Sequence, residues 1–148
     1  MKNILSSFLS LIMMFMLLCV TPVYYWSIID YAKTSTVLLA STRNVIDEVI
    51  DTKQLSDITY DEFLLDIATV SGYYDAKITR YKMIVNPTPT GGTQVSYMIV
   101  DDFKTYDSGD KISVKVTPVG SSYFEAISKA FLGLSINADS FTIVGRVR

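Results

Sequence analysis

The hydrophobic and polar positions divide the chain into a charge-free N-terminal segment and a mixed remainder. Residues 4–29 contain no Asp, Glu, Lys or Arg. At 1.5 Å of rise per residue, a helix over this segment would be about 39 Å long, more than the ~30 Å hydrocarbon core of a bilayer. The rings of Tyr24, Tyr25 and Trp26 near its end are typical of a membrane–water boundary. The pattern predicts a transmembrane helix within residues 1–29.

This helix has the features of a retained anchor rather than of a cleavable signal. Its apolar run exceeds the roughly 7–15 residues of a signal peptide, and no A-x-A-like exit follows it. Cys19 also lacks the small residue that precedes a lipoprotein cysteine. Because Lys2 is the only basic side chain on the short side, we expect this end in the cytoplasm. The remainder, residues 30–148, is then a membrane-anchored head outside the cytoplasm.

The helical pattern continues beyond the apolar segment. Nothing that breaks a helix lies between Asp30 and Leu55, and the apolar residues there recur at spacings of three and four. The pattern predicts one rod from about residue 4 to 53, about 75 Å long, with residues 30–55 as its amphipathic half. Pro22 should kink or locally melt this helix, either as a bend near the membrane surface or as a feature of packing against copies of itself.

A second, short helix is expected after the rod. Thr59 is the predicted N-cap, with Glu62 reaching back as in a capping box, and residues 71–72 end the helix. Its predicted buried stripe consists of Phe63, Leu64, Ile67 and Val70.

Beyond residue 72 the hydrophobic period changes from helical to two. Strands are predicted over residues 76–85, 95–100, 111–119 and 141–148, with a hairpin turn at 86–92. A helix capped by Ser121 or Ser122 should run to about Leu134, with a buried stripe of Phe124, Ile127, Ala130, Phe131 and Leu134. We therefore predict an α+β fold: a long N-terminal helix and a small antiparallel head of about four strands and two short helices.

Composition narrows the possible functions. The 148 residues include 13 basic and 15 acidic side chains, no histidine and one cysteine. A single cysteine excludes an internal disulfide framework and a cysteine-rich metal site. Without histidine, Ser-His-Asp and Cys-His catalysis and most zinc sites are excluded. A net charge of −2 without a basic cluster argues against nucleic-acid binding. We expect no enzyme activity, and no catalytic, cofactor-binding or metal-ligating residues.

Two acidic segments have an ordinary explanation. The acids between residues 47 and 66 are accompanied by a single basic residue, Lys53. They are interpreted as a solvated surface, with pairing to a basic patch on a neighbouring subunit as the alternative. The acids of the polar connection at residues 101–110 do not have the spacing of a calcium loop, so this segment is interpreted as a solvated turn. The ten tyrosines are assigned to core or strand packing, with assembly contacts as the alternative.

Three segments of the chain match a known family: Pro22 followed by Val23, Tyr24 and Tyr25, the strand Lys111–Val116 after Gly109 and Asp110, and the final segment from Phe141 to Arg148. By these features the chain resembles type IV pilin-like proteins, and most closely the TadE-like minor pilins of tight-adherence systems. In contrast to the glutamate at the fifth mature position of such proteins, Leu5 stands fifth here and no glutamate precedes Glu48.

The resemblance implies a structural subunit of a pilus-like filament, or of its assembly machinery, at the cell surface. It would polymerise with itself or with related subunits, and lipid would surround the helix before assembly. The alternative is a single-pass accessory protein of a secretion or conjugation complex that does not polymerise. The residues expected to make the membrane and assembly contacts are Phe8, Leu11, Ile12, Phe15, Leu18, Pro22, Tyr24, Tyr25 and Trp26.

Overall fold

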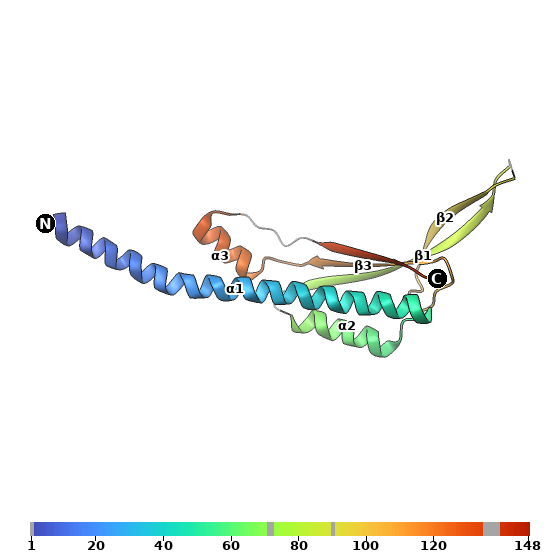
Figure 1. Cartoon of the computed structure of the whole chain (residues 1–148), viewed down its shortest axis with the longest axis horizontal. Coiled ribbons are helices and arrows are strands. Elements are labelled where there is room, and N and C mark those ends of the chain that lie inside the picture. The colour runs from blue at the N-terminus through green and yellow to red at the C-terminus, as the bar shows by residue number, and fades with distance from the viewer. Residues whose placement is uncertain (1, 71–72, 90, 135–139) are drawn as a thin grey trace.

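The computed structural model describes residues 2–70, 73–89, 91–134 and 140–148. It contains a long helix, two short helices and one antiparallel sheet, which confirms the predicted α+β class (Figure 1). The elements in chain order are α1 (Lys2–Thr52), α2 (Asp57–Thr69), β1 (Tyr74–Pro87), β2 (Thr93–Val100), β3 (Lys111–Pro118), α3 (Tyr123–Leu132) and β4 (Phe141–Arg146).

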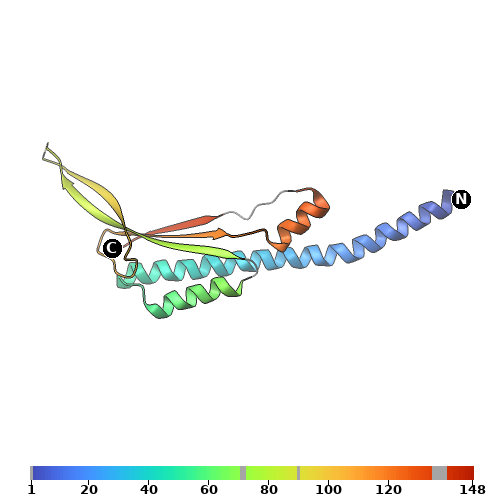
Figure 2. The same cartoon turned by 180° about the vertical axis from the view of Figure 1, so that it is seen from behind.

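The predicted rod is confirmed as the single helix α1. Its N-terminal half extends away from the other elements, whereas its C-terminal half lies along the sheet and α2 (Figures 1 and 2). The helix continues through Pro22 without interruption, so the expected local melting there is wrong. A gentle change of direction in its N-terminal half is what remains of the predicted bend (Figure 2).

The sheet has the strand order β2-β1-β3-β4. The long strand β1 pairs with β3 through its first eight residues, from Tyr74 opposite Pro118 to Tyr81 opposite Lys111. It pairs with β2 through its last eight, from Arg80 opposite Val100 to Pro87 opposite Thr93. The two pairings share only Arg80 and Tyr81, so the β1–β2 hairpin projects beyond the rest of the sheet at the end far from the N-terminus (Figure 1).

The core lies between one face of the sheet and the helices α1 and α2. The alternation predicted for β3 is confirmed, because Ile112, Val114 and Val116 are all buried. Gly145 of β4 lies opposite Ile112 and lets α1 approach closely, since a Cβ atom there would be 2.5 Å from Cγ2 of Ile46. The buried apolar residues are Leu38, Val45, Ile46, Val49, Leu55, Phe63, Ile67, Tyr106, Ile112, Val114, Val116 and Val147.

The two short helices begin differently from one another. The predicted cap Thr59 is wrong for α2: Ser56 is the N-cap, and its Oγ accepts a hydrogen bond from the Thr59 N–H at 3.1 Å. Ser56 has the extended backbone that an N-cap needs, so the helix starts one turn earlier. In α3, Ser122 is the cap and forms the complete capping box with Glu125.

The ends and buried stripes of these helices are only partly as predicted. Phe63 and Ile67 of α2 are buried and Val70 is half-buried against the core, but Leu64 is exposed. The expected end of α2 at residues 71–72 lies outside the described residues. The α3 helix ends at Leu132 because Gly133 takes a left-handed C-cap, so Leu134 lies beyond it and is exposed. Ala130 is also exposed, and the side chain of Phe131 lies outside the described part of the chain.

The close contact at Gly145 generates a stability prediction. We expect Gly145→Ala to lower the free energy of unfolding by about 1–3 kcal/mol, because the new methyl group meets Ile46 at a branch atom next to the backbone. Urea denaturation of the full chain in detergent, followed by circular dichroism, measures this. Val144→Ala, at the exposed neighbour, is the control and should change stability by no more than about 0.5 kcal/mol. Equal effects of the two substitutions would contradict the packing argument.

Candidate membrane and assembly surface

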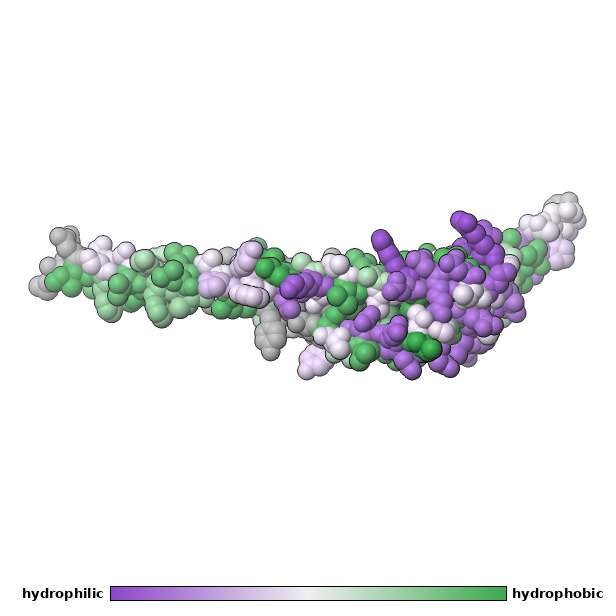
Figure 3. Space-filling model, turned by 60° about the horizontal axis from the view of Figure 1, so that its bottom comes forward, coloured by the Kyte–Doolittle hydropathy of each residue, from purple (hydrophilic) through white to green (hydrophobic). Residues whose placement is uncertain are grey.

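The N-terminal half of α1 exposes its apolar side chains around the whole helix. Seven of the nine predicted contact residues have exposed fractions between 43% and 69%: Phe8, Leu11, Ile12, Phe15, Leu18, Tyr25 and Trp26. A helix that is hydrophobic all round is stable only when lipid or other apolar helices surround it. Figure 3 shows this hydrophobic rod beside a head whose visible surface is largely hydrophilic.

Pro22 and Tyr24, the other two predicted contact residues, have different surroundings. Pro22 is exposed and lies in a shallow apolar groove of α1, together with Met14, Leu17, Leu18, Thr21 and Tyr25. Tyr24 is half-buried, because its ring packs on Phe124 of α3 with the ring centroids 5.7 Å apart. Tyr24 thus contacts the head, a role that sequence reasoning missed since Phe124 lies 100 residues further along.

The transition from exposed to packed helix lies near α3. Phe124 also packs on Tyr31, at 5.4 Å between centroids, and the first buried residue of α1 is Thr34. The exposed apolar surface therefore ends about where α3 contacts the helix.

A groove of about 600 Å³ lies beside this contact, between α1, the end of α2 and the start of α3. Its polar side chains are Ser27, Asp30, Tyr31, Tyr73, Ser121 and Ser122. Burial raises the pKa of the neighbouring Tyr74, and the nearby charges of Glu125 and Asp30 raise it further. A single carboxylate among hydroxyl groups provides neither a carboxylate pair nor a nucleophile with a base. Within the described ranges, no group of three or more Cys, Asp or Glu side chains is placed to hold a metal ion.

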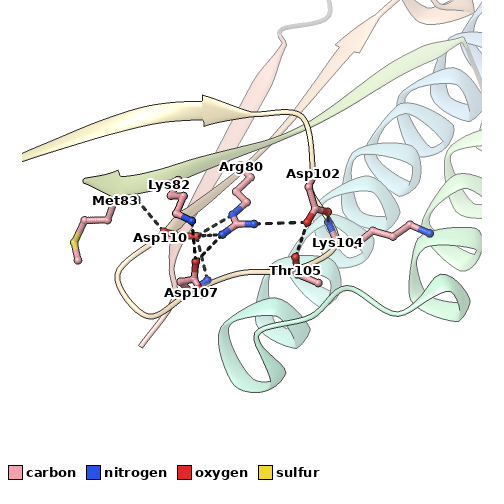
Figure 4. A network of polar contacts seen from close by, with 8 residues as sticks. All are labelled: Arg80, Lys82, Met83, Asp102, Lys104, Thr105, Asp107 and Asp110. Atoms are coloured by element: carbon pink, nitrogen blue, oxygen red, sulfur yellow. Dashed lines mark hydrogen bonds and ion pairs between the residues drawn. The ribbon is translucent and has the colours of Figure 1, made fainter. Parts of the chain in front are cut away.

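A buried ion-pair network lies at the start of the projecting hairpin (Figure 4). The interpretation of residues 101–110 as a solvated turn is wrong for Asp110, which is 1% exposed. Arg80 donates from Nε to Oδ2 of Asp110 at 2.8 Å and from Nη2 to Oδ2 of Asp107 at 3.1 Å. The N–H groups of Met83 and Asp107 donate to the two carboxylate oxygens of Asp110, at 2.9 and 3.1 Å.

Electrostatics explain why Asp110 stays charged. Burial alone would raise its pKa, but the two backbone N–H groups and the Arg80 guanidinium outweigh that effect and lower it below the ordinary value of 3.8. Arg80 also lies over the ring of Tyr106, and burial raises the pKa of that tyrosine. Because Arg80 is 6% exposed and surrounded by partners from its own chain, the network holds the connection at residues 101–110 against β1 and offers no binding site.

The fold and the exposed helix define an α+β protein with one helix of membrane-spanning length. Among the described residues, α1 is the one helix long and apolar enough to cross a membrane, and its most apolar window has a mean hydropathy of 2.4 with no part buried. An α+β head is built onto the same helix. Comparisons with models of protein families, with curated proteins and with solved structures find no match.

The ion-pair network predicts a dependence of stability on pH. Because the folded-state pKa of Asp110 is lowered, its contribution is complete above the ordinary value of 3.8 and is lost as the pH falls through the folded-state pKa. We expect Asp110→Asn to cost about 3 kcal/mol at pH 7, since Arg80 loses its best buried partner, and to flatten the fall of stability below pH 4. Urea denaturation between pH 3 and 7 measures both effects.

The matched control is Asp101→Asn, at an exposed position of the same connection. It should leave the unfolding free energy at pH 7 and its acid dependence nearly unchanged. An Asp110→Asn protein as stable as the parent at pH 7 would contradict the role given to the buried pair.

Proposed function

We propose that this chain is a structural subunit of a pilus-like extracellular filament, or of its assembly machinery, and that it polymerises through its apolar N-terminal helix. The observation that carries the proposal is the unbroken continuity of α1. One half exposes apolar side chains on all sides, and the other half forms the centre of the head. Contacts made by the apolar half therefore fix the position of each head directly.

Two environments can cover the apolar half. In the bilayer it is surrounded by lipid, so transfer into a helix bundle gains little from the hydrophobic effect and depends on close packing. The apolar groove at Pro22 supports such packing, because it offers a recess to side chains of a neighbouring helix. In this proposal the head lies outside the cytoplasm, lipid covers residues 4–29 before assembly, and copies of the same helix cover them afterwards.

The alternative function is that of a single-pass accessory protein in a secretion or conjugation complex that does not polymerise. One observation favours it: residues 4–29 contain no acidic side chain that would fix the register of neighbouring helices by a charged contact. Under this alternative the groove at Pro22 packs against a helix of a different protein.

Fractionation of cells that produce the chain separates the two functions. The filament proposal predicts that mechanical shearing releases the chain into a high-molecular-weight fraction and that electron microscopy of this fraction shows fibres labelled by an antibody against the head. The antibody should also label intact cells. Recovery of the chain only in the washed membrane fraction, with no labelled fibres, would reject polymerisation and favour the accessory function.

A substitution at Pro22 tests the helix contacts. Pro22→Ala restores a backbone N–H and removes the local constraint on helix direction, so we expect a changed yield or geometry of sheared filaments with membrane insertion unaltered. Alkaline extraction of membranes measures insertion, and electron microscopy measures the filaments. Ser27→Ala, two residues beyond the groove at Pro22, is the control and should leave both readouts unchanged. Identical filaments from the Pro22→Ala chain would remove this residue from the assembly contact.

A further inference from the structure

One face of the sheet is left uncovered by the described helices of the chain. Ile112, Val114 and Val116 point toward the helices, so the alternate residues of β3 and their partners on β1 and β4 point the opposite way. Among the described residues, no helix packs on that side. We call it the outer sheet face, and it includes Asp75, Lys77, Thr79, Lys111, Lys115, Val144 and Arg146.

The outer sheet face carries a surplus of positive charge, because its four basic residues outnumber its one acid, Asp75. Lys77 and Lys115 lie directly opposite one another on adjacent strands, an arrangement that destabilises a sheet by like-charge repulsion. Within the described part of the chain, neither forms an ion pair. Lys111, in contrast, lies 3.9 Å above the ring of Tyr97. Val144 adds an apolar surface that is 57% exposed. A partner for this face needs negative charge and some apolar area.

A second surface of the same chain has these properties. Ile58, Asp61, Glu62 and Leu65 of α2 occur at positions i, i+3, i+4 and i+7, so they share one side of the helix, and all four are exposed. The two apolar residues are 73% and 62% exposed and lie on either side of the two acids. We call these four residues the α2 outer face. Figure 3, turned to bring the α2 side forward, shows hydrophobic spots set in a hydrophilic surface.

The two faces also match in scale. The seven helical steps from Ile58 to Leu65 span about 10.5 Å, and two steps between adjacent strands of the sheet span about 9.6 Å. A helix laid across β1, β3 and β4 would therefore place Asp61 and Glu62 over the middle strand β3, above Lys115 and one strand from Lys77, with its apolar ends over β1 and β4. The occupant is a second copy of this chain, because charge and apolar area are complementary between the two faces.

The geometry points to a head-to-head contact in which the α2 outer face of one copy packs on the outer sheet face of the next. Each copy has one face of each kind, so the contact is heterologous and generates an open array rather than a closed pair. This inference rests on the proposed function and deepens it: packing of α1 supplies adhesion between subunits, and the head contact sets the orientation of neighbours.

Disulfide trapping tests the contact in the full chain. In a Cys19→Ser background, a copy carrying Leu65→Cys and a differently tagged copy carrying Val144→Cys are produced together, and isolated cell envelopes are mildly oxidised. We expect a disulfide-linked dimer that carries both tags, and no dimer between two Leu65→Cys copies. Trapping no stronger than that with a Val85→Cys copy, on the projecting hairpin, would overturn the inference. Strong pairing of Leu65→Cys copies with one another would also overturn it, since it indicates a symmetric contact.

Charge exchange provides the second arm. Lys77→Glu with Lys115→Glu should reduce trapping roughly tenfold by repulsion from Asp61 and Glu62, and so should Asp61→Lys with Glu62→Lys. All four substitutions in both copies should restore it. The control, Lys33→Glu with Lys129→Glu, makes the same change in net charge at two exposed sites outside both faces and should not affect trapping. Circular dichroism of each variant confirms folding. Reduced trapping without restoration by the exchange would refute the pairing.

Two further measurements keep this inference separate from the proposed function. Purified full-length chain is tested for flotation with vesicles containing phosphatidylglycerol. If the Lys77→Glu, Lys115→Glu chain floats less with these vesicles than the parent chain does, while trapping is unchanged, the outer sheet face binds an anionic lipid surface. That result would overturn the inference. Sheared filaments without the trapped dimer refute the head contact and leave the filament proposal standing. Trapped dimers in membranes that yield no filaments support the contact and refute polymerisation.

Discussion

The helix α1 is continuous, but its two halves have incompatible surroundings: the first half is exposed and apolar, and the second half is buried in the head. The other elements are arranged along the helix to suit this difference. Its second half is buried by α2 and the sheet from Thr34 to Val49. Among the described residues, its first half is covered only near Tyr24, and its exposed apolar side chains tolerate water poorly. Because a helix is stiff over this length, the head cannot turn independently of the apolar segment. The contact of Phe124 with Tyr24 and Tyr31 strengthens this coupling at the point where the two halves meet.

The sheet depends on β1 in a comparable way. This strand belongs to two ladders that scarcely overlap, and at their junction Arg80 points into the head, where apolar residues would ordinarily lie. Asp110 compensates its charge and is itself fixed by two backbone N–H groups. One ion pair therefore closes the loop between β2 and β3 and anchors the root of the projecting hairpin. A buried pair of this kind contributes little net stability compared with apolar packing, but losing one partner is costly.

The elements that followed from local pattern were predictable, and those that depended on distant pairing were not. Residues 4–29 and the alternation of Ile112, Val114 and Val116 specify their structures through neighbours in the sequence. The burial of Asp110 depends instead on a register that brings Arg80 next to a residue thirty positions away, so the acids of 101–110 resembled an ordinary turn. The prediction of the α2 N-cap was wrong because Ser56 and Thr59 are both good N-cap residues. The extended backbone at Ser56 makes that residue the cap. The exposure of the apolar side chains between Phe8 and Leu18 also follows from local pattern, whereas the position of Tyr24 against the head does not.

An assembly built from such subunits would combine two interactions with different physical characters. Packing among apolar helices is short-ranged and insensitive to salt, but a surface that is hydrophobic all round distinguishes poorly between rotations of the helix. Contacts between charged faces are weak individually and are screened by salt, yet they reject misaligned neighbours because like charges then meet. In this chain the first kind of surface lies on residues 4–29, and the second lies on α2 and the sheet, joined through one continuous helix. Packing of the apolar half leaves the rotation of the helix about its axis undetermined. Because the head is built on the same helix, contacts between heads would fix that rotation.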